Sequence, residues 1–305
     1  MTLDAYLDAR RREIDAALAT ILPSPPDCPQ VLHDAMRYSL MAGGKRLRPI
    51  LCLAAAEAVG GDRALAMPAA CAIEMIHTYS LIHDDLPAMD NDTMRRGRPT
   101  LHVAAGEGQA ILAGDGLLTQ AFTLLASEPR TSDADLISRK LEVIRIVSTA
   151  AGPIGMVGGQ AIDLACVTPD PNGDLAPPLD ADGLCRMHGK KTGAMIRASA
   201  ASGAVMAGGT RAQIAAVDDA AGELGLAFQI VDDVLDVEGA SAHLGKTAGK
   251  DAAAGKPTYP ALYGIEGSRR MAAECLARAE ATLRDAGMDD SWLPAIGRWI
   301  VERSK

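Results

Sequence analysis

Two apolar stretches that each run into clustered aspartates, AIEMIHTYSLIHDDL (residues 72–86) and LGLAFQIVDDVLDV (residues 224–237), decide the fold class of this chain. Both have the length and periodicity of helices, and few segments elsewhere have the β-branched character of strands. A chain of 305 residues, 48% of them apolar, is long enough to build one large helical core. The sequence therefore predicts an all-α helical bundle that forms a single domain over residues 1–305.

The same periodicity predicts where the helices lie, and proline and glycine mark their ends. Pro23, Pro25 and Pro26 end the first helix, Gly43-Gly44 ends the second, and Pro49 can open the third. The predicted helices span residues 2–20, 29–42, 49–59, 63–86, 107–127, 133–150, 153–165, 180–206, 210–238, 257–264, 268–286 and 291–303, with longer loops at 166–179 and 239–257.

Composition excludes several classes of protein. The formal net charge of −9 and a sequence pI near 5.2 argue against a nucleic-acid partner. The six cysteines are scattered without a CxxC pair, so we expect free thiols in a reducing compartment. The amino terminus has no signal-peptide pattern, and charged residues interrupt the most apolar segments. We therefore expect a cytoplasmic protein with no stable membrane anchor.

The first acidic cluster comprises Asp84, Asp85 and Asp90, at the end of an apolar helix. Pro87 should disrupt that helix near Leu86, so ideal helix geometry cannot place Asp90. If the three carboxylates act together, the chain must bend and return Asp90 toward Asp84. The sequence therefore predicts a turn between them.

The second cluster lies within one predicted helix. Gln229, Asp232, Asp233 and Asp236 stand at positions i, i+3, i+4 and i+7, which share a helix face. Crowded carboxylates repel one another unless cations neutralise them. Mg²⁺ suits such a face because it binds one or two carboxylates and completes its shell with water and phosphate oxygens. An acidic solvated face is the alternative, but both clusters interrupt strongly apolar sequence.

Basic residues beside glycines complement the two acidic clusters. GGKRLRP (residues 43–49) places cations at a turn before a helix N-terminus, which favours anion binding. A nucleotide P-loop is a poor fit, because Ala240 stands where its first glycine would be needed and no strand precedes the segment. Outside this segment, the further basic residues are Arg95, Arg96, Lys190, Lys191, Lys246, Lys250 and Lys256. Together with GGKRLRP they could hold two diphosphates.

These motifs, in this order, resemble the trans-isoprenyl diphosphate synthases, and among them most closely the bacterial farnesyl diphosphate synthases. The resemblance covers essentially the whole chain. Class I terpene cyclases are similar in fold and first motif, but they normally carry a different second motif and lack GGKR. The matching segments are GGKRLRP (43–49), SLIHDDLPAMDNDTMRRGRPT (80–100), GGQAIDL (158–164), KTGAMIR (191–197), FQIVDDVLD (228–236), LGKTAGKD (244–251) and GKPTYPAL (255–262).

The resemblance implies a bundle with a deep central cavity, usually in a homodimer, that joins five-carbon isoprenoid units with three Mg²⁺ ions when substrate is bound. The substrates would be isopentenyl diphosphate and an allylic diphosphate. Loss of diphosphate would give an allylic cation, which the double bond of isopentenyl diphosphate attacks before a proton leaves. The segment 239–257 would close over the site.

Residue roles follow from the same resemblance. The metal ligands would be Asp84, Asp90 and Asp232, with Asp85, Asp233 and Asp236 completing the clusters. The allylic diphosphate would be held by Arg95, Lys191 and Lys246, with Lys256 joining on closure. Isopentenyl diphosphate would be held by Lys45, Arg48, His77 and Arg96, with a weaker case for Arg303 or Lys305. The oxygens facing the cation would come from Thr192 and Gln229.

Two histidines differ in how the sequence places them. His77 precedes Asp84 by seven residues, so the two lie about 20° apart around an ideal helix and face the same side. A buried core histidine is the alternative for His77. Neither His83 nor His102 receives a role.

Product length depends on a floor to the apolar well. Ideal geometry favours Ser80, about 40° from Asp84, over Tyr79, about 140° away. The resemblance favours Tyr79, because an aromatic residue five positions before the first aspartate usually marks a fifteen-carbon product. We follow the resemblance and expect farnesyl diphosphate. The alternatives are a geranylgeranyl diphosphate synthase, a non-catalytic subunit of a heteromeric synthase, and a class I terpene cyclase.

Overall fold

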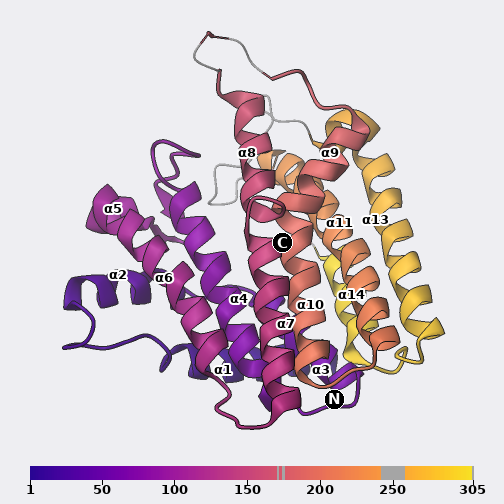
Figure 1. Cartoon of the computed structure of the whole chain (residues 1–305). Coiled ribbons are helices and arrows are strands. Elements are labelled where there is room, and N and C mark those ends of the chain that lie inside the picture. Colours follow the sequence, from indigo (N-terminus) through magenta and orange to yellow (C-terminus); the bar gives the residue numbers. More distant parts are fainter. Residues whose placement is uncertain (170–171, 174–175, 242–257, 304–305) are drawn as a thin grey trace. The chain divides into compact units, whose positions relative to one another are not determined.

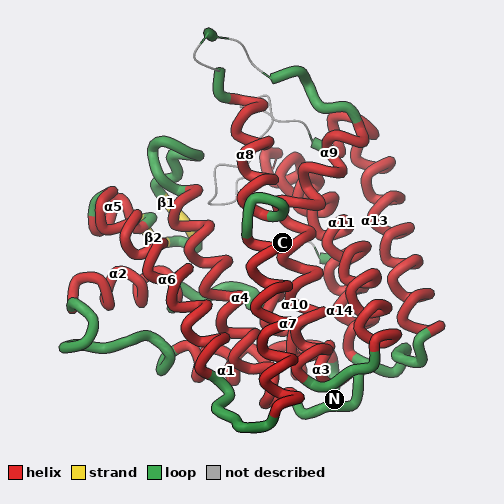
Figure 2. Tube along the Cα trace, in the orientation of Figure 1, coloured by secondary structure: helices red, strands yellow, loops and turns green. Residues whose placement is uncertain are grey.

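The computed structural model describes residues 1–169, 172–173, 176–241 and 258–303. Within these residues the protein is helical almost throughout, and one two-stranded hairpin is its sheet structure (Figure 2). The all-α prediction is confirmed. The chain divides into two compact units, residues 1–145 with 202–208 and residues 146–201 with 209–305, and each is described by itself. The single domain and the central cavity stay predictions.

The first unit is built around α4, which packs beside α6 and α3 (Figure 1). The segment 202–208 of this unit also approaches α3 closely, because a Cβ added at Gly203 would be 1.8 Å from the Cys52 carbonyl oxygen. Its elements are α1 (Leu3–Leu18), α2 (Gln30–Leu40), α3 (Leu47–Ala58), α4 (Arg63–Asp84), β1 (Met94–Arg95), β2 (Arg98–Pro99), α5 (Leu101–Ala105), α6 (Glu107–Ser127) and the first part of α7 (Ala134–Ala151).

The turn before α3 contains a buried arginine. Arg46 has a left-handed backbone (φ 52°) as the residue before the helix, and only 2% of it is exposed. Its guanidinium donates to Glu74 at 2.6 Å, to the Leu40 carbonyl at 2.8 Å and to Asp15 at 2.9 Å. Arg46 therefore fastens the GGKR turn to α4 and to α1.

The second unit is built around α11 and α13, which run side by side (Figure 1). Leu184, Met187, Ile230 and Tyr259 are among the buried residues that form its core. Its elements are α8 (Met156–Val167), α9 (Ala181–His188), a five-residue π-helical turn η1 (Gly189–Gly193), α10 (Ala194–Met206, which ends in the first unit), α11 (Arg211–Ser241), α13 (Tyr259–Asp285) and α14 (Trp292–Glu302).

Most helix boundaries fall within a few residues of the prediction. α3 begins at Leu47, so Pro49 lies in its first turn instead of opening it. α4 ends at Asp84, two residues before the expected end. The predicted break within 257–286 is a non-helical Gly264 inside α13. The hairpin, α5 and the π-helical turn are the elements that periodicity did not reveal.

Two further observations bear on the compartment. All six cysteines are free thiols. Among the described residues, α4, α6 and the segment Ala134–Val167 are long and apolar enough to cross a membrane, by length and composition only. In the most apolar 18-residue stretch of α4, 67% is buried inside the protein, so burial in the first unit explains most of its apolar character. The corresponding stretches of α6 and of Ala134–Val167 are 33% and 28% buried.

Candidate active site

The first acidic cluster lies where α4 gives way to a tight loop. The Asp90 N–H donates to the Asp84 carbonyl at 2.8 Å, and the Asn91 N–H donates to the Leu86 carbonyl at 3.1 Å. Asn91 takes a left-handed backbone with φ of 51°. The predicted return of the chain toward Asp84 is therefore confirmed. Asp84 is half-buried and Asp90 exposed, so the loop presents both at the end of the helix.

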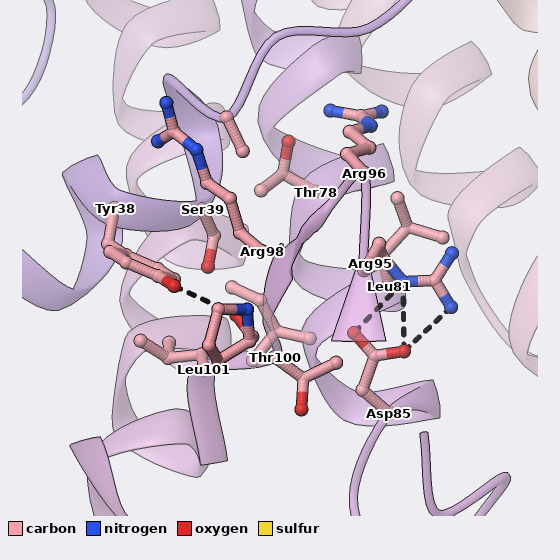
Figure 3. Close-up of a pocket in the computed structure, with 13 residues that line it drawn as sticks. Tyr38, Ser39, Thr78, Leu81, Asp85, Arg95, Arg96, Arg98, Thr100 and Leu101 are labelled. Atoms are coloured by element: carbon pink, nitrogen blue, oxygen red, sulfur yellow. Dashed lines mark hydrogen bonds and ion pairs between the residues drawn. The ribbon is translucent and has the colours of Figure 1, made fainter. Parts of the chain in front are cut away.

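The middle aspartate of this cluster faces the protein. Asp85 is 3% exposed, and Arg95 from the hairpin donates to its carboxylate through Nε at 2.8 and 2.9 Å and through Nη2 at 2.6 Å (Figure 3). Burial raises the pKa of Asp85, and the bonds from Arg95 oppose that rise. The pair anchors the hairpin to α4. It borders a small pocket that Thr78, Leu81 and Leu101 also line.

The hairpin carries a second arginine to the GGKR turn. Arg96 has a left-handed backbone, and its guanidinium donates to the Gly43 carbonyl. The same guanidinium covers Gly44, where an added Cβ would stand 2.7 Å from its carbon. Gly44 also has a φ of +126°, which other residues rarely adopt. Gly43 therefore holds the Arg96 guanidinium through its carbonyl, and Gly44 leaves the space that the guanidinium occupies.

His77 lies among these cations. Its Nε2 is 3.4 Å from Nη1 of Arg48. Burial lowers the pKa of His77 well below the usual 6.5, and the positive charges of Arg48, Arg96 and Arg95 lower it further. His77 is thus neutral near pH 7 and can offer an N–H without adding charge. The structure brings three of the four residues expected to hold isopentenyl diphosphate to one place, and Lys45 is exposed on the adjoining turn.

The two product-length candidates have different surroundings. Tyr79 is 7% exposed, and its ring meets the His83 ring edge-on, with centroids 5.7 Å apart at 81°. Ser80 is half-buried, and its hydroxyl donates to the His77 carbonyl of its own helix at 2.9 Å.

In the second unit, Lys191 lies in the π-helical turn and donates to Asp163 of α8 at 2.5 Å. Asp163 is 5% exposed. An added Cβ at Gly159 would stand 2.2 Å from the Lys191 backbone nitrogen, so glycine permits this close contact. Sequence reasoning gave Asp163 no role. The signal was the GGQAIDL segment, which places a lone carboxylate in an apolar helix one turn after the glycines.

A chain of hydrogen bonds links η1 to the second acidic cluster. The Thr192 hydroxyl donates to Gln229 at 2.8 Å, and the Gln229 amide donates to Asp233 at 2.9 Å. The other oxygen of Asp233 accepts from the Tyr259 N–H at 3.0 Å. Asp233 is 4% exposed, so this carboxylate joins α11 to the start of α13. Asp233, the second aspartate of its pair, thus faces the protein interior, as Asp85 does in the first cluster.

The first aspartate of that pair meets the C-terminal segment. Arg303 donates to Asp232 at 2.6 Å and to the Phe228 carbonyl at 2.9 Å, and its guanidinium lies 4.0 Å from the Phe228 ring centroid. The Arg303 side chain is 4% exposed, whereas that of Asp232 is 44% exposed. Asp236 is half-buried one turn further along α11. Arg303 thus contacts the second acidic cluster, whereas the resemblance weakly favoured a diphosphate role.

The described residues contain no group of three or more His, Cys, Asp or Glu side chains arranged to hold a metal ion. Lys246, Lys250, Lys256 and Lys305 lie outside the described residues, and so does most of the expected closing segment 239–257. The metal and substrate roles predicted from the sequence therefore stay predictions.

A sequence model of the polyprenyl synthetase family matches residues 29–286. The chain belongs to the polyprenyl synthetase family. This polyprenyl synthetase is 43% identical to the farnesyl diphosphate synthase of Geobacillus stearothermophilus, over 99% of this chain and 98% of the relative. It is 46% identical to geranylgeranyl pyrophosphate synthase 9 of Arabidopsis thaliana, over 94% of this chain and 76% of the relative.

Solved structures agree with this assignment. The apo crystal structure of an FPP/GFPP synthase from Zymomonas mobilis is 38% identical to this polyprenyl synthetase. The match covers 98% of both chains with a TM-score of 0.85. The predicted family is confirmed, and the protein is a prenyltransferase of isoprenoid metabolism.

Proposed function

We propose that this chain is a farnesyl diphosphate synthase, which condenses isopentenyl diphosphate with dimethylallyl and then geranyl diphosphate, head to tail. The observation that supports it best is the first acidic loop, in which Asp90 returns to Asp84 at the end of the helix that carries the buried Tyr79. The full-length similarity to a farnesyl diphosphate synthase supports the fifteen-carbon product.

The residues present fit Mg²⁺. Carboxylate oxygens are ligands that this ion prefers, and one or two per ion suffice when water and substrate phosphates complete the shell, so a cluster of three is not required. Asp84, Asp90 and Asp232 would hold it, because each is at least partly exposed while Asp85 and Asp233 are buried in structural bonds. When bound, Mg²⁺ would offset the negative charge that builds on the departing diphosphate.

A Mg²⁺ ion bound by Asp232 would share this carboxylate with Arg303, which donates to its Oδ1. The protein's own cations act beside the carboxylates. Arg95 and Lys191 would grip the allylic diphosphate, each held in place by a buried carboxylate, Asp85 or Asp163. Preorganised charges of this kind stabilise a transition state without having to reorient. Lys246 and Lys256 are proposed for the same diphosphate from sequence similarity alone.

Isopentenyl diphosphate would bind Lys45, Arg48, His77 and Arg96. A neutral His77 beside Arg48 would donate a hydrogen bond and leave the positive charge to the neighbouring arginines. Thr192 and Gln229 would turn oxygen dipoles toward the allylic cation; Thr192 keeps lone pairs available because its proton is given to Gln229.

One incubation tests the proposal. The purified chain is supplied with isopentenyl diphosphate, dimethylallyl diphosphate and Mg²⁺, and the dephosphorylated products are sized by chromatography. A fifteen-carbon alcohol is expected from the wild type, and Tyr79→Ala should shift the product toward twenty carbons or more. A wild-type product of twenty carbons would identify the geranylgeranyl alternative, which the plant relative favours.

Other outcomes of the same incubation would reject the proposal. In a parallel incubation with geranyl or farnesyl diphosphate, a hydrocarbon or an unphosphorylated alcohol formed before dephosphorylation would indicate a terpene cyclase. No turnover by a folded chain, restored by a second subunit, would indicate a non-catalytic partner.

We further propose a cytoplasmic homodimer with no stable membrane anchor. The exposed apolar side chains Val103, Ile111 and Leu112 on α5 and α6 support the homodimer, and light scattering would measure its mass.

A further inference from the structure

His83 precedes the first acidic cluster by one residue and has no role in the reaction described above. Its Nε2 lies 3.2 Å from the Ile111 carbonyl on α6. A carbonyl oxygen only accepts hydrogen bonds, so Nε2 carries the proton and donates it. The Asp115 carboxylate is 4.0 Å from the same nitrogen. The end of α4 is thereby tied to α6 through one imidazole ring.

A glycine on α6 makes room for that ring. A Cβ added at Gly114 would stand 2.1 Å from Nε2 of His83 and 2.6 Å from Cδ2. Carbon atoms pack at about 3.5 Å or more, so the ring would have to retreat by roughly 1 Å or more. Because Nε2 is both the atom nearest this Cβ and the atom bonded to the Ile111 carbonyl, a ring that swings away would lengthen or break that bond. Gly114 is therefore the notch in which His83 lies.

The His83 ring also packs against Tyr79. The two rings meet edge-to-face at 5.7 Å, with Tyr79 one helical turn earlier on α4. Tyr79 is buried, and its ring direction depends on what packs beside it. A line of contacts therefore runs from Gly114 on α6 through His83 to Tyr79, the residue proposed as the floor of the product well.

We propose that His83, held in the Gly114 notch, positions Tyr79 and thereby limits product length, which makes Gly114 a specificity-determining residue although it touches no substrate. The inference rests on the proposed function, in which Tyr79 is the floor. When the notch is filled or His83 is removed, the Tyr79 ring loses its support and turns away. The well deepens, and longer products accumulate.

The decisive comparison is between two glycine-to-alanine changes on the same helix. Gly114→Ala should raise the ratio of twenty- to fifteen-carbon product roughly three- to tenfold, the size expected for loss of one edge-to-face contact. Gly108→Ala should leave the ratio unchanged, because a Cβ there meets no atom within 4 Å. Both changes replace a glycine of α6 with a better helix former, although Gly108 lies in the first turn and Gly114 in the interior.

A double-mutant cycle isolates the contact. His83→Ala should raise the ratio in the same direction as Gly114→Ala. Once His83 is gone the notch is empty, so the double variant should match His83→Ala alone instead of adding the two effects. Thermal melts confirm that each variant is folded, and His83→Ala keeps the test available should Gly114→Ala fail to fold.

The results separate this inference from the proposed function. If Tyr79→Ala lengthens the product but neither Gly114→Ala nor His83→Ala does, the positioning role is overturned and the proposed function stands. Additive effects in the double variant would also overturn it. If Tyr79→Ala leaves the product unchanged, the floor and its support both fail. If the wild type makes no prenyl diphosphate, the proposed function itself fails.

Discussion

Replacing Arg46 with methionine tests whether this arginine of the GGKR turn is structural. The Arg46 side chain is 1% exposed and that of Glu74 is 2% exposed, so Arg46→Met leaves a carboxylate in the core without its partner. Removing one member of a buried ion pair costs about 3–5 kcal/mol. Asp15 is 37% exposed in its side chain and can turn to water, so its loss adds less than about 1 kcal/mol. The expected loss is therefore about 4 kcal/mol.

Urea unfolding measures this change, and Lys45→Met is the matched control because the neighbouring lysine is exposed. Lys45→Met should keep the wild-type midpoint. The double variant Arg46→Met with Glu74→Leu should recover most of the stability, since an apolar pair of similar volume is often as stable as a buried ion pair. A loss below about 1 kcal/mol for Arg46→Met, or a double variant no better than the single, would refute the reasoning.

Two further predictions concern the second unit. Burial lowers the pKa of His188 from 6.5 to about 4, so the unfolded chain takes up this proton first and stability is lost as pH falls from about 6.5 toward 4. His188→Phe should remove up to roughly 3 kcal/mol of that acid sensitivity, seen as a flatter melting temperature against pH; parallel curves would contradict the assignment. Asp163→Asn should cost about 2 kcal/mol, because it breaks a charge-assisted bond between largely buried groups. Glu142→Gln breaks an exposed ion pair with the same 2.5 Å separation and should leave the melting temperature unchanged, so equal shifts in the two variants would count against the burial argument.

Local rules gave the helices and the first acidic loop. Apolar periodicity placed most helix ends. Pro87 predicted that the helix ends near Leu86, and the return of Asp90 followed only if the three carboxylates act together; the bond from the Asp90 N–H to the Asp84 carbonyl confirms that return. The ideal-helix prediction for the second cluster also fits, because Gln229 through Asp236 lie within continuous α11.

Contacts between distant segments were beyond those rules. Nothing local distinguishes Arg46, which is buried against Glu74, from Lys45, which is exposed. The pairing of Asp85 with Arg95 depends on a hairpin of two-residue strands, too short for a periodic signal. Lys191 stands in a π-helical turn opposite Asp163, and neither the turn nor the partner follows from spacing. The joint placement of Asp84 and Asp232 stays a prediction.

The burial of Asp85 and Asp233 has a consequence for how mutants of this enzyme are interpreted. Each of these carboxylates acts as a fastener, one for the arginine hairpin and one for the first residue of α13. A dead Asp85→Ala or Asp233→Ala enzyme would therefore report a loosened scaffold, even though its sequence position invites a chemical explanation. Asp84 and Asp90, which are half-buried and exposed, are the better positions for a kinetic test, whereas exchange of Asp232 also removes the ion-pair partner of the buried Arg303.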